Sequence, residues 1–287
     1  MEVKREKNSV PRPRGDFRPA GLQCDAMKPL LPLLVLLAVS ARAASAADCA
    51  ACTATKLCEP HATTDKEAGK AFREGLGKPD PAVRASAVLL FAEACALHSN
   101  CRPVTNALLL AAALKDPDGA VRGKAAEKLG EQDSRTVGPI FGKEAEPLRK
   151  KLEKDPKGAK EEAAWLANYD FLKGICAALA IMGSADATPA LAEFLSSTRL
   201  KVLDAATEAA PKVRTKEVVA AMLGAIDRVR NTPAGGDRDA TWVKLLKTWE
   251  EMTRSSIKAP DPSDPNDAIR FVTDCKAWWK TNEKTWK

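Results

Sequence analysis

Residue types that usually carry catalysis are scarce in this chain of 287 residues. It has only two histidines, His61 and His98, and a single tyrosine, Tyr169. The Gly-x-Ser-x-Gly, P-loop, His-Glu-x-x-His and Gly-x-Gly-x-x-Gly motifs are all absent. The adjacent glutamates at 161–162 and 250–251 would point in different directions on a helix and could not share a substrate. The sequence therefore predicts no catalytic activity and no cofactor.

Long hydrophobic runs are also missing. The apolar run from Leu30 to Val39 has ten residues, whereas a transmembrane helix needs roughly 20. Lys28 precedes this run and small residues follow it up to Ala46, which is the pattern of a cleavable secretory signal. We expect a signal peptide over residues 27–46, cleavage after Ala46, and a secreted or periplasmic protein without stable membrane insertion.

The chain beyond residue 46 has no strong charge of one sign. Residues 1–46 carry 8 of the 45 Lys and Arg and 4 of the 38 Asp and Glu, which leaves 37 basic against 34 acidic residues. The sequence thus gives little support for nucleic-acid binding. Residues 1–26 are basic and rich in proline, and we expect them to be disordered, whether translation starts at Met1 or at Met27.

The most informative pattern that is present is an internal repeat. Residues 80–84 (DPAVR) return 38 positions later as residues 118–122 (DGAVR), each time opening an alanine-rich helix. Aspartate is a favourable N-cap, and proline is tolerated at the first helical position. A period near 38 with two helices per unit is typical of solenoids, whose units bury their apolar faces against neighbours. The predicted fold is all-α, an α-solenoid of stacked antiparallel helix pairs.

Apolar periodicity and helix-capping residues define the expected elements. Helices are predicted over 64–76, 80–94, 103–114, 118–129, from 136, and over 164–182, 186–195, 200–210, 215–229, 239–252 and 267–280. The first should begin with a capping box of Thr64 and Glu67. The charged segment 142–162 is interpreted as a helical insertion or an extended connection, either a solvated face or a basic docking site. The expected organisation is a disordered extension with signal peptide (1–46), a loop-like cysteine-rich leader (47–63), a solenoid (64–230) and a tryptophan-rich helical cap (231–287).

The Asp-x-Ala-Val-Arg motif, followed by alanine and leucine or phenylalanine, resembles the first helix of HEAT repeats. The chain's C-terminal segment also resembles the end of secreted bacterial HEAT-repeat proteins. The resemblance implies a HEAT-like superhelix in which the aspartate caps, the valine packs and the arginine bonds to the next repeat. It assigns these structural roles to Asp80, Val83, Arg84, Asp118, Val121 and Arg122.

Seven cysteines would remain after signal cleavage. Cysteines in an exported protein usually pair, and an odd number leaves one unpaired. Cys176 is the expected buried free thiol, because it lies in an apolar helical segment. The disulfide candidates are Cys49, Cys52, Cys58, Cys95, Cys101 and Cys275. Alternatively, Cys49, Cys52, Cys58 and His61 have ligand types and spacing suited to zinc, or to thiol redox chemistry.

Five of the six tryptophans lie in the last 46 residues. They could cap the final repeat, or Trp242, Trp249, Trp278 and Trp279 could line an exposed groove for a partner. Together these features predict an exported HEAT-repeat scaffold that binds a protein partner of unknown identity. The alternative is an exported metal-binding or thiol-redox protein that uses the cysteine-rich leader.

Overall fold

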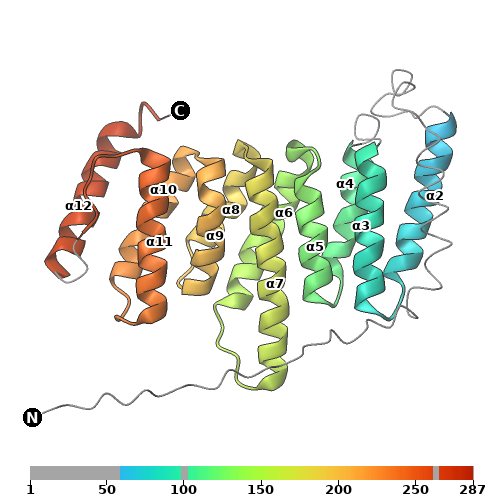
Figure 1. Cartoon of the computed structure of the whole chain (residues 1–287), viewed down its shortest axis with the longest axis horizontal. Coiled ribbons are helices and arrows are strands. Elements are labelled where there is room, and N and C mark those ends of the chain that lie inside the picture. Colours follow the sequence, from blue (N-terminus) through green and yellow to red (C-terminus); the bar gives the residue numbers. More distant parts are fainter. Residues whose placement is uncertain (1–58, 98–102, 261–264, 287) are drawn as a thin grey trace, which may run out of the picture. The chain divides into compact units, whose positions relative to one another are not determined.

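The structure is a computed structural model that describes residues 59–97, 103–260 and 265–286. Within these ranges it contains eleven α-helices and no strand (Figure 1). The helices are α2 (Glu59–Leu76), α3 (Pro81–Leu97), α4 (Pro103–Ala112), α5 (Gly119–Gly130), α6 (Ser134–Leu152), α7 (Ala159–Met182), α8 (Thr188–Leu195), α9 (Leu200–Val213), α10 (Lys216–Arg230), α11 (Gly236–Thr253) and α12 (Pro265–Asn282). The all-α prediction is confirmed for this part of the chain. None of its helices combines the length and the apolar character that a membrane span requires.

The first described helix begins earlier than the sequence pattern indicates. The leader was expected to stay loop-like to residue 63, with a capping box at Thr64 and Glu67, but α2 is already helical from Glu59. Pro60 follows Glu59 directly, and proline is well suited to the first turn of a helix. The predicted capping box is therefore wrong. The signal peptide (27–46) and leader residues 47–58 lie outside the described residues.

Consecutive helices alternate between two rows. In one row α3 contacts α5, α5 contacts α7, α7 contacts α9, and α9 contacts α11. In the other row α4 contacts α6, α6 contacts α8, α8 contacts α10, and α10 contacts α12. Helix α2 packs on α3. Helices α3 to α11 thus each pack against a helix two positions along the chain and against at least one immediate neighbour.

Glycine and alanine allow α5 and α7 to come into backbone contact. A Cβ atom added to Gly174 on α7 would lie 2.1 Å from the Gly123 carbonyl oxygen and 2.5 Å from the Gly123 Cα atom on α5. A Cβ atom added to Gly119 would lie 2.1 Å from the Ala167 carbonyl oxygen. Helix α7 has 24 residues and α5 has 12, so the first turns of α7 extend past the neighbouring helices (Figure 1).

The two repeat arginines make equivalent contacts at their own helix starts. The Arg84 Nη1 atom donates to the Lys78 and Pro79 carbonyl oxygens at 3.1 and 2.7 Å. The Arg122 Nη1 atom donates to the Asp116 and Pro117 carbonyl oxygens at 2.7 and 3.1 Å. These acceptors are themselves 38 positions apart, so the sequence repeat is also a repeat of hydrogen bonds.

Each repeat arginine also reaches the following unit. Arg84 donates from Nε and Nη2 to the two carboxylate oxygens of Asp116, at 2.7 and 3.0 Å, in a buried bidentate pair. The pKa of the Arg84 guanidinium is raised, chiefly by this hydrogen bond. Arg122 donates from Nη2 to the Ala167 carbonyl oxygen on α7 at 3.0 Å. These bonds tie α3 to the start of α5, and α5 to α7.

The caps and valines of the repeat differ slightly between the two units. Asp80 accepts from the Ala82 amide at 2.8 Å, and Asp118 accepts from the Ala120 and Val121 amides at 2.9 and 3.1 Å. Val121 is only 1% exposed, whereas Val83, expected to pack equally well, is half-buried. Gly119 and Gly123 have no side chains, so α7 can pack closely over the start of α5 and bury Val121. The equivalent positions of α3, 38 residues earlier, are Pro81 and Ala85, whose side chains do not leave this room beside Val83.

Prolines interrupt the helices less than the sequence suggests. Helix α6 contains Pro139 and Pro147, and α9 continues past Pro211 to Val213. An internal proline removes one backbone hydrogen bond, but buried side chains such as Leu148, Leu152 and Val213 keep these turns packed. The charged segment 142–162 is therefore divided between the end of α6, a short connection and the start of α7.

Candidate interaction surface

The C-terminal tryptophans form a packed cluster. Trp242, Trp249 and Trp279 are buried, and Trp249 is only 1% exposed. Trp278 lies 5.9 Å from Trp249 and 6.5 Å from Trp279 between ring centroids, and Trp286 contacts both Trp278 and Trp279. The interpretation as an exposed binding groove is therefore wrong for Trp242, Trp249 and Trp279, which are buried. Trp278 is half-buried and packs edge to face on Trp249.

The tail beyond α12 is fixed to the same cluster. The Trp286 Nε1 atom donates to the Arg214 carbonyl oxygen at 3.0 Å, at the end of α9. The Trp242 ring meets Phe271 of α12 edge to face at 6.4 Å, and Arg238 lies over Trp242 at 5.2 Å. The tryptophans thus join α11, α12 and the end of α9, as expected of a helical cap.

The cysteines give no site within the described residues. Cys49, Cys52, Cys58 and Cys101 lie outside those residues, and so does the side chain of His61, whose backbone belongs to α2. Cys95 is buried on α3, and no group of residues able to hold a metal occurs in the described part of the chain. Both the zinc and the redox interpretation of the leader therefore remain predictions.

Two thiols are buried in the helical core. Cys176 is an unpaired, buried thiol on α7, as the sequence indicates. Cys275, expected among the disulfide candidates, is also an unpaired thiol, because its position on the inner face of α12 places it among apolar side chains. Burial raises the pKa of the Cys275 thiol to about 12 and raises the pKa of the Cys176 thiol still further. Neither thiol is suited to be a nucleophile.

A partly exposed pair of aromatic rings lies on α7. Trp165 and Tyr169 are stacked with centroids 5.4 Å apart and ring planes 16° apart. The Lys201 Nζ atom, from the start of α9, lies 5.6 Å from the Trp165 centroid, and the Lys173 Nζ atom lies 5.3 Å from the Tyr169 centroid. We call these four residues the aromatic–lysine platform. Both rings are half-buried, so part of each faces solvent.

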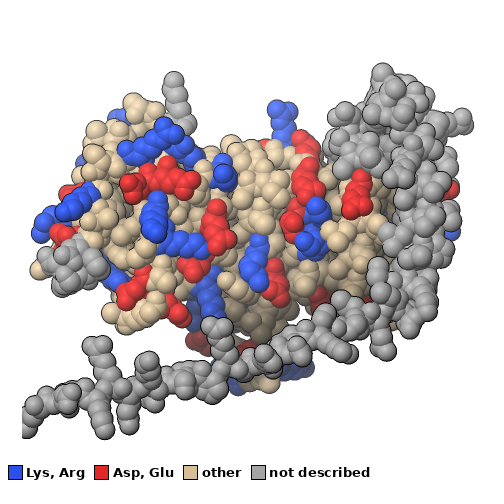
Figure 2. Space-filling model, in the orientation of Figure 1, with Lys and Arg blue, Asp and Glu red and all other residues tan. Residues whose placement is uncertain are grey.

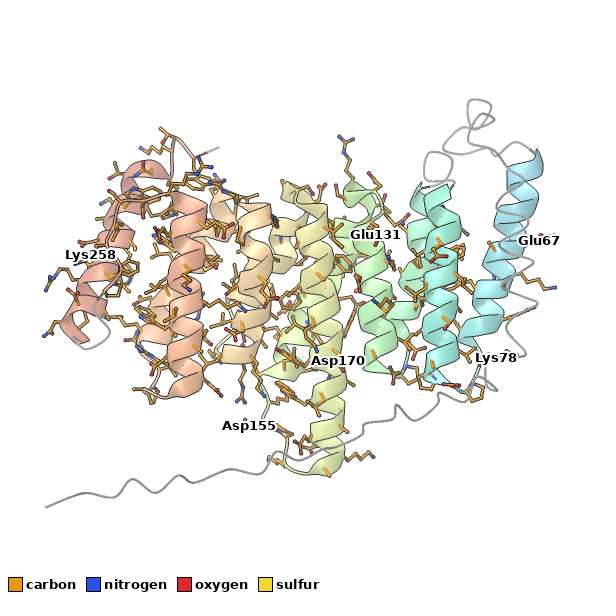
Figure 3. The ribbon with its side chains drawn as sticks, in the orientation of Figure 1. Glu67, Lys78, Glu131, Asp155, Asp170 and Lys258 are labelled. Carbon is orange, nitrogen blue, oxygen red and sulfur yellow. The ribbon has the colours of Figure 1, made fainter. Side chains whose placement is uncertain are left out.

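The platform is held in place by backbone and neighbouring charges. The Trp165 Nε1 atom donates to the Leu152 carbonyl oxygen at the end of α6, at 2.9 Å, which fixes the indole. Lys173 pairs with Asp170 at 2.8 Å; Asp170 is labelled on α7 in Figure 3. Partial burial raises the pKa of the Tyr169 hydroxyl. The side chains are therefore oriented before any ligand arrives.

The charges around the platform are mixed. Figure 2 shows Lys and Arg interspersed with Asp and Glu over the described helices on the face that it draws. On the helices beside the platform, Lys244 pairs with Glu208 at 2.8 Å, and its Nζ atom also donates to the Asp204 carbonyl oxygen. Such a surface suits specific contacts with a partner better than general attraction to a polyanion.

The sequence contains a pattern that indicates part of this surface. Trp165, Tyr169 and Lys173 are spaced by four residues, so on a helix they lie along one face. Lys201 has no such signal, because its approach to Trp165 depends on the packing of α9 against α7.

No protein-family model matches the chain, and no curated protein and no solved structure matches it. The contacts of the described residues are therefore the basis for a proposed function.

Proposed function

We propose that this chain is an exported HEAT-like α-solenoid that acts as a scaffold for binding a protein partner. The observation that carries the proposal is the repeated arginine contact. Arg84 and Arg122 bind equivalent carbonyl oxygens 38 residues apart, and each also bonds to the following unit. Together with the two rows of helices, this pattern supports units that stack in chain order.

Stacked helix pairs present broad faces on which side chains from several units lie together. The aromatic–lysine platform lies on such a face, because Trp165 and Tyr169 come from α7 and Lys201 comes from α9. The scarcity of histidine and of catalytic motifs also favours a binding role over an enzymatic one.

Export is proposed from the signal pattern of residues 27–46 and is compatible with the thiols. An unpaired cysteine in an oxidising compartment persists when it is buried and remains protonated. Cys176 and Cys275 meet both conditions, since burial raises the pKa of each thiol.

The test is affinity purification of the tagged full chain from its native host, after mild cross-linking of separated envelope and cytoplasmic fractions. We expect a processed chain that starts at Ala47, together with a partner protein at constant stoichiometry. A matched chain lacking residues 27–46 should stay in the cytoplasm and lose that partner. An unprocessed cytoplasmic chain would refute export, and a processed chain that remains monomeric and alone would refute the scaffold function.

A further inference from the structure

We infer that the solvent-facing side of α6, α8 and α10 binds an acidic, extended segment of the partner protein. This inference rests on the proposed function and names the chemistry of the partner segment. Helices α6, α8 and α10 follow one another in one row, and α7, α9 and α11 follow one another in the other row. The first three helices carry eight basic and five acidic residues, whereas the other three carry seven basic and nine acidic residues. The two rows thus differ in charge.

The ion pairs of α6, α8 and α10 increase this difference. Every carboxylate of these helices except that of Glu217 is already paired with a cation: Glu144 with Lys115, Glu146 with Lys150, Glu193 with Arg149, and Asp227 with Arg230 and Lys276. Five cations of the same helices have no ion pair within the described ranges. We call these five residues the basic face: Arg135, Lys143, Lys151, Lys216 and Arg228.

Few carboxylates beside the basic face compete with an acidic ligand. Glu217 is the single carboxylate of α6, α8 and α10 without an ion pair among the residues described. Asp133 and Asp186, which precede α6 and α8, accept hydrogen bonds from the hydroxyls of Thr136 and Ser134. On α7, α9 and α11 the balance is reversed, since four cations and six carboxylates of that part of the structure have no ion pair. An acidic segment is therefore attracted more strongly to the basic face than to the other row.

Arg228 is the half-buried member of the basic face. Its Nη2 atom donates to the Leu195 carbonyl oxygen at the end of α8, and its Nε atom is buried without a hydrogen-bond partner in the described part of the chain. A Cβ atom added to Gly224 would lie 3.3 Å from the Arg228 Nη1 atom, so the guanidinium lies along α10 beside a position that has no side chain. The Nη1 atom donates to no described residue. A partner carboxylate can therefore accept from Nη1 without displacing an internal acceptor.

The basic face lacks the aromatic rings on which nucleotide bases stack. The two aromatic residues of α6, α8 and α10 are Phe141 and Phe194, and both are fully buried. Sites for single-stranded nucleic acids combine cations with exposed aromatic side chains. On α6, α8 and α10 the small residues Gly142, Ala192 and Gly224 are partly exposed instead, so the backbone of a partner segment can come close to the helices. These features suit an acidic polypeptide better than a polynucleotide.

The experiment measures fluorescence anisotropy of labelled probes with the full chain. The probes are a peptide of Asp, Glu and Gly, the same peptide with Lys and Arg in place of the acidic residues, and an oligothymidylate of the same charge as the acidic peptide. We expect the acidic peptide to bind most tightly and to weaken with added salt. The double variant Lys143→Glu with Lys216→Glu should weaken it by at least about tenfold, and Arg228→Gln by at least about threefold.

The double variant Lys160→Glu with Lys247→Glu is the matched control. Both lysines are exposed, on α7 and α11, and the net charge of the chain changes by the same amount. This control should bind the acidic peptide like the unmodified chain, and circular dichroism should show all variants folded. The inference is overturned if the acidic peptide does not bind, if the basic peptide or the oligothymidylate binds as tightly, or if the two double variants bind alike. Loss of peptide binding with retention of the purified partner would refute the basic face alone and leave the scaffold function standing.

Discussion

Replacing Gly174 by alanine tests the backbone contact between α5 and α7. The new Cβ atom would lie 2.1 Å from the Gly123 carbonyl oxygen, whereas non-bonded heavy atoms prefer about 3.5 Å, so the helices must separate by about 1 Å. Backbone atoms cannot rotate away as a side chain can. We therefore expect an overpacking cost near the upper end of about 1–3 kcal/mol. The better helix propensity of alanine returns about 1 kcal/mol, which leaves a net loss of about 2 kcal/mol.

Gly69→Ala on α2 is the matched control. A Cβ atom there would meet only ordinary contacts, with Leu109 at 3.7 Å and Arg73 at 3.8 Å. This variant should gain up to about 1 kcal/mol. Urea unfolding followed by far-UV circular dichroism measures both changes, and the two midpoints should move in opposite directions. If Gly174→Ala is as stable as Gly69→Ala, α5 and α7 are not in contact as described.

The remaining predictions concern other parts of the helical core. Val121→Asp buries an unpaired charge at a position that is 1% exposed and should lower the unfolding free energy by more than about 3 kcal/mol; an unchanged thermal melt would place Val121 at the surface. Asn106→Leu should raise the free energy of unfolding by about 1 kcal/mol or more, because both side-chain amide atoms of Asn106 are buried without a hydrogen-bond partner among the described residues; destabilisation in urea would show that they are bonded. Arg254→Gly should stabilise by about 1 kcal/mol, since Arg254 has φ 51° in the left-handed region that favours glycine; a lower thermal midpoint would contradict this. The Cys275 thiol, with a pKa of about 12, should resist iodoacetamide in the native state even at mildly alkaline pH and react on unfolding; rapid native labelling detected by mass spectrometry would show that α12 does not cover it.

The features that the sequence predicted well are local or repeated. The Asp118 cap follows from the preference of aspartate for helix starts, and the inter-unit bond of Arg122 follows from the resemblance to HEAT repeats. The helices over residues 80–230 follow from apolar periodicity, which depends on each segment alone.

The features that it missed depend on how helices pack. Cys275 looked like a disulfide candidate, but its face of α12 turns inward. The four C-terminal tryptophans proposed for binding could form a cap or a groove, and the burial of three of them depends on how α11 and α12 meet through their rings. Lys201 and Trp165 are 36 residues apart, so no local pattern could place them together. Arg254 takes a left-handed conformation at a helix end, where glycine is the usual residue, so no glycine in the sequence marks this position.

A crystal structure of the full chain would test the stacking of successive units most directly. The expected result is a bidentate Arg84–Asp116 pair joining α3 to the start of α5, and an Arg122 guanidinium bonded to the Ala167 carbonyl oxygen of α7. Strands between residues 80 and 230, or a helical bundle in which α5 does not lie between α3 and α7, would contradict it.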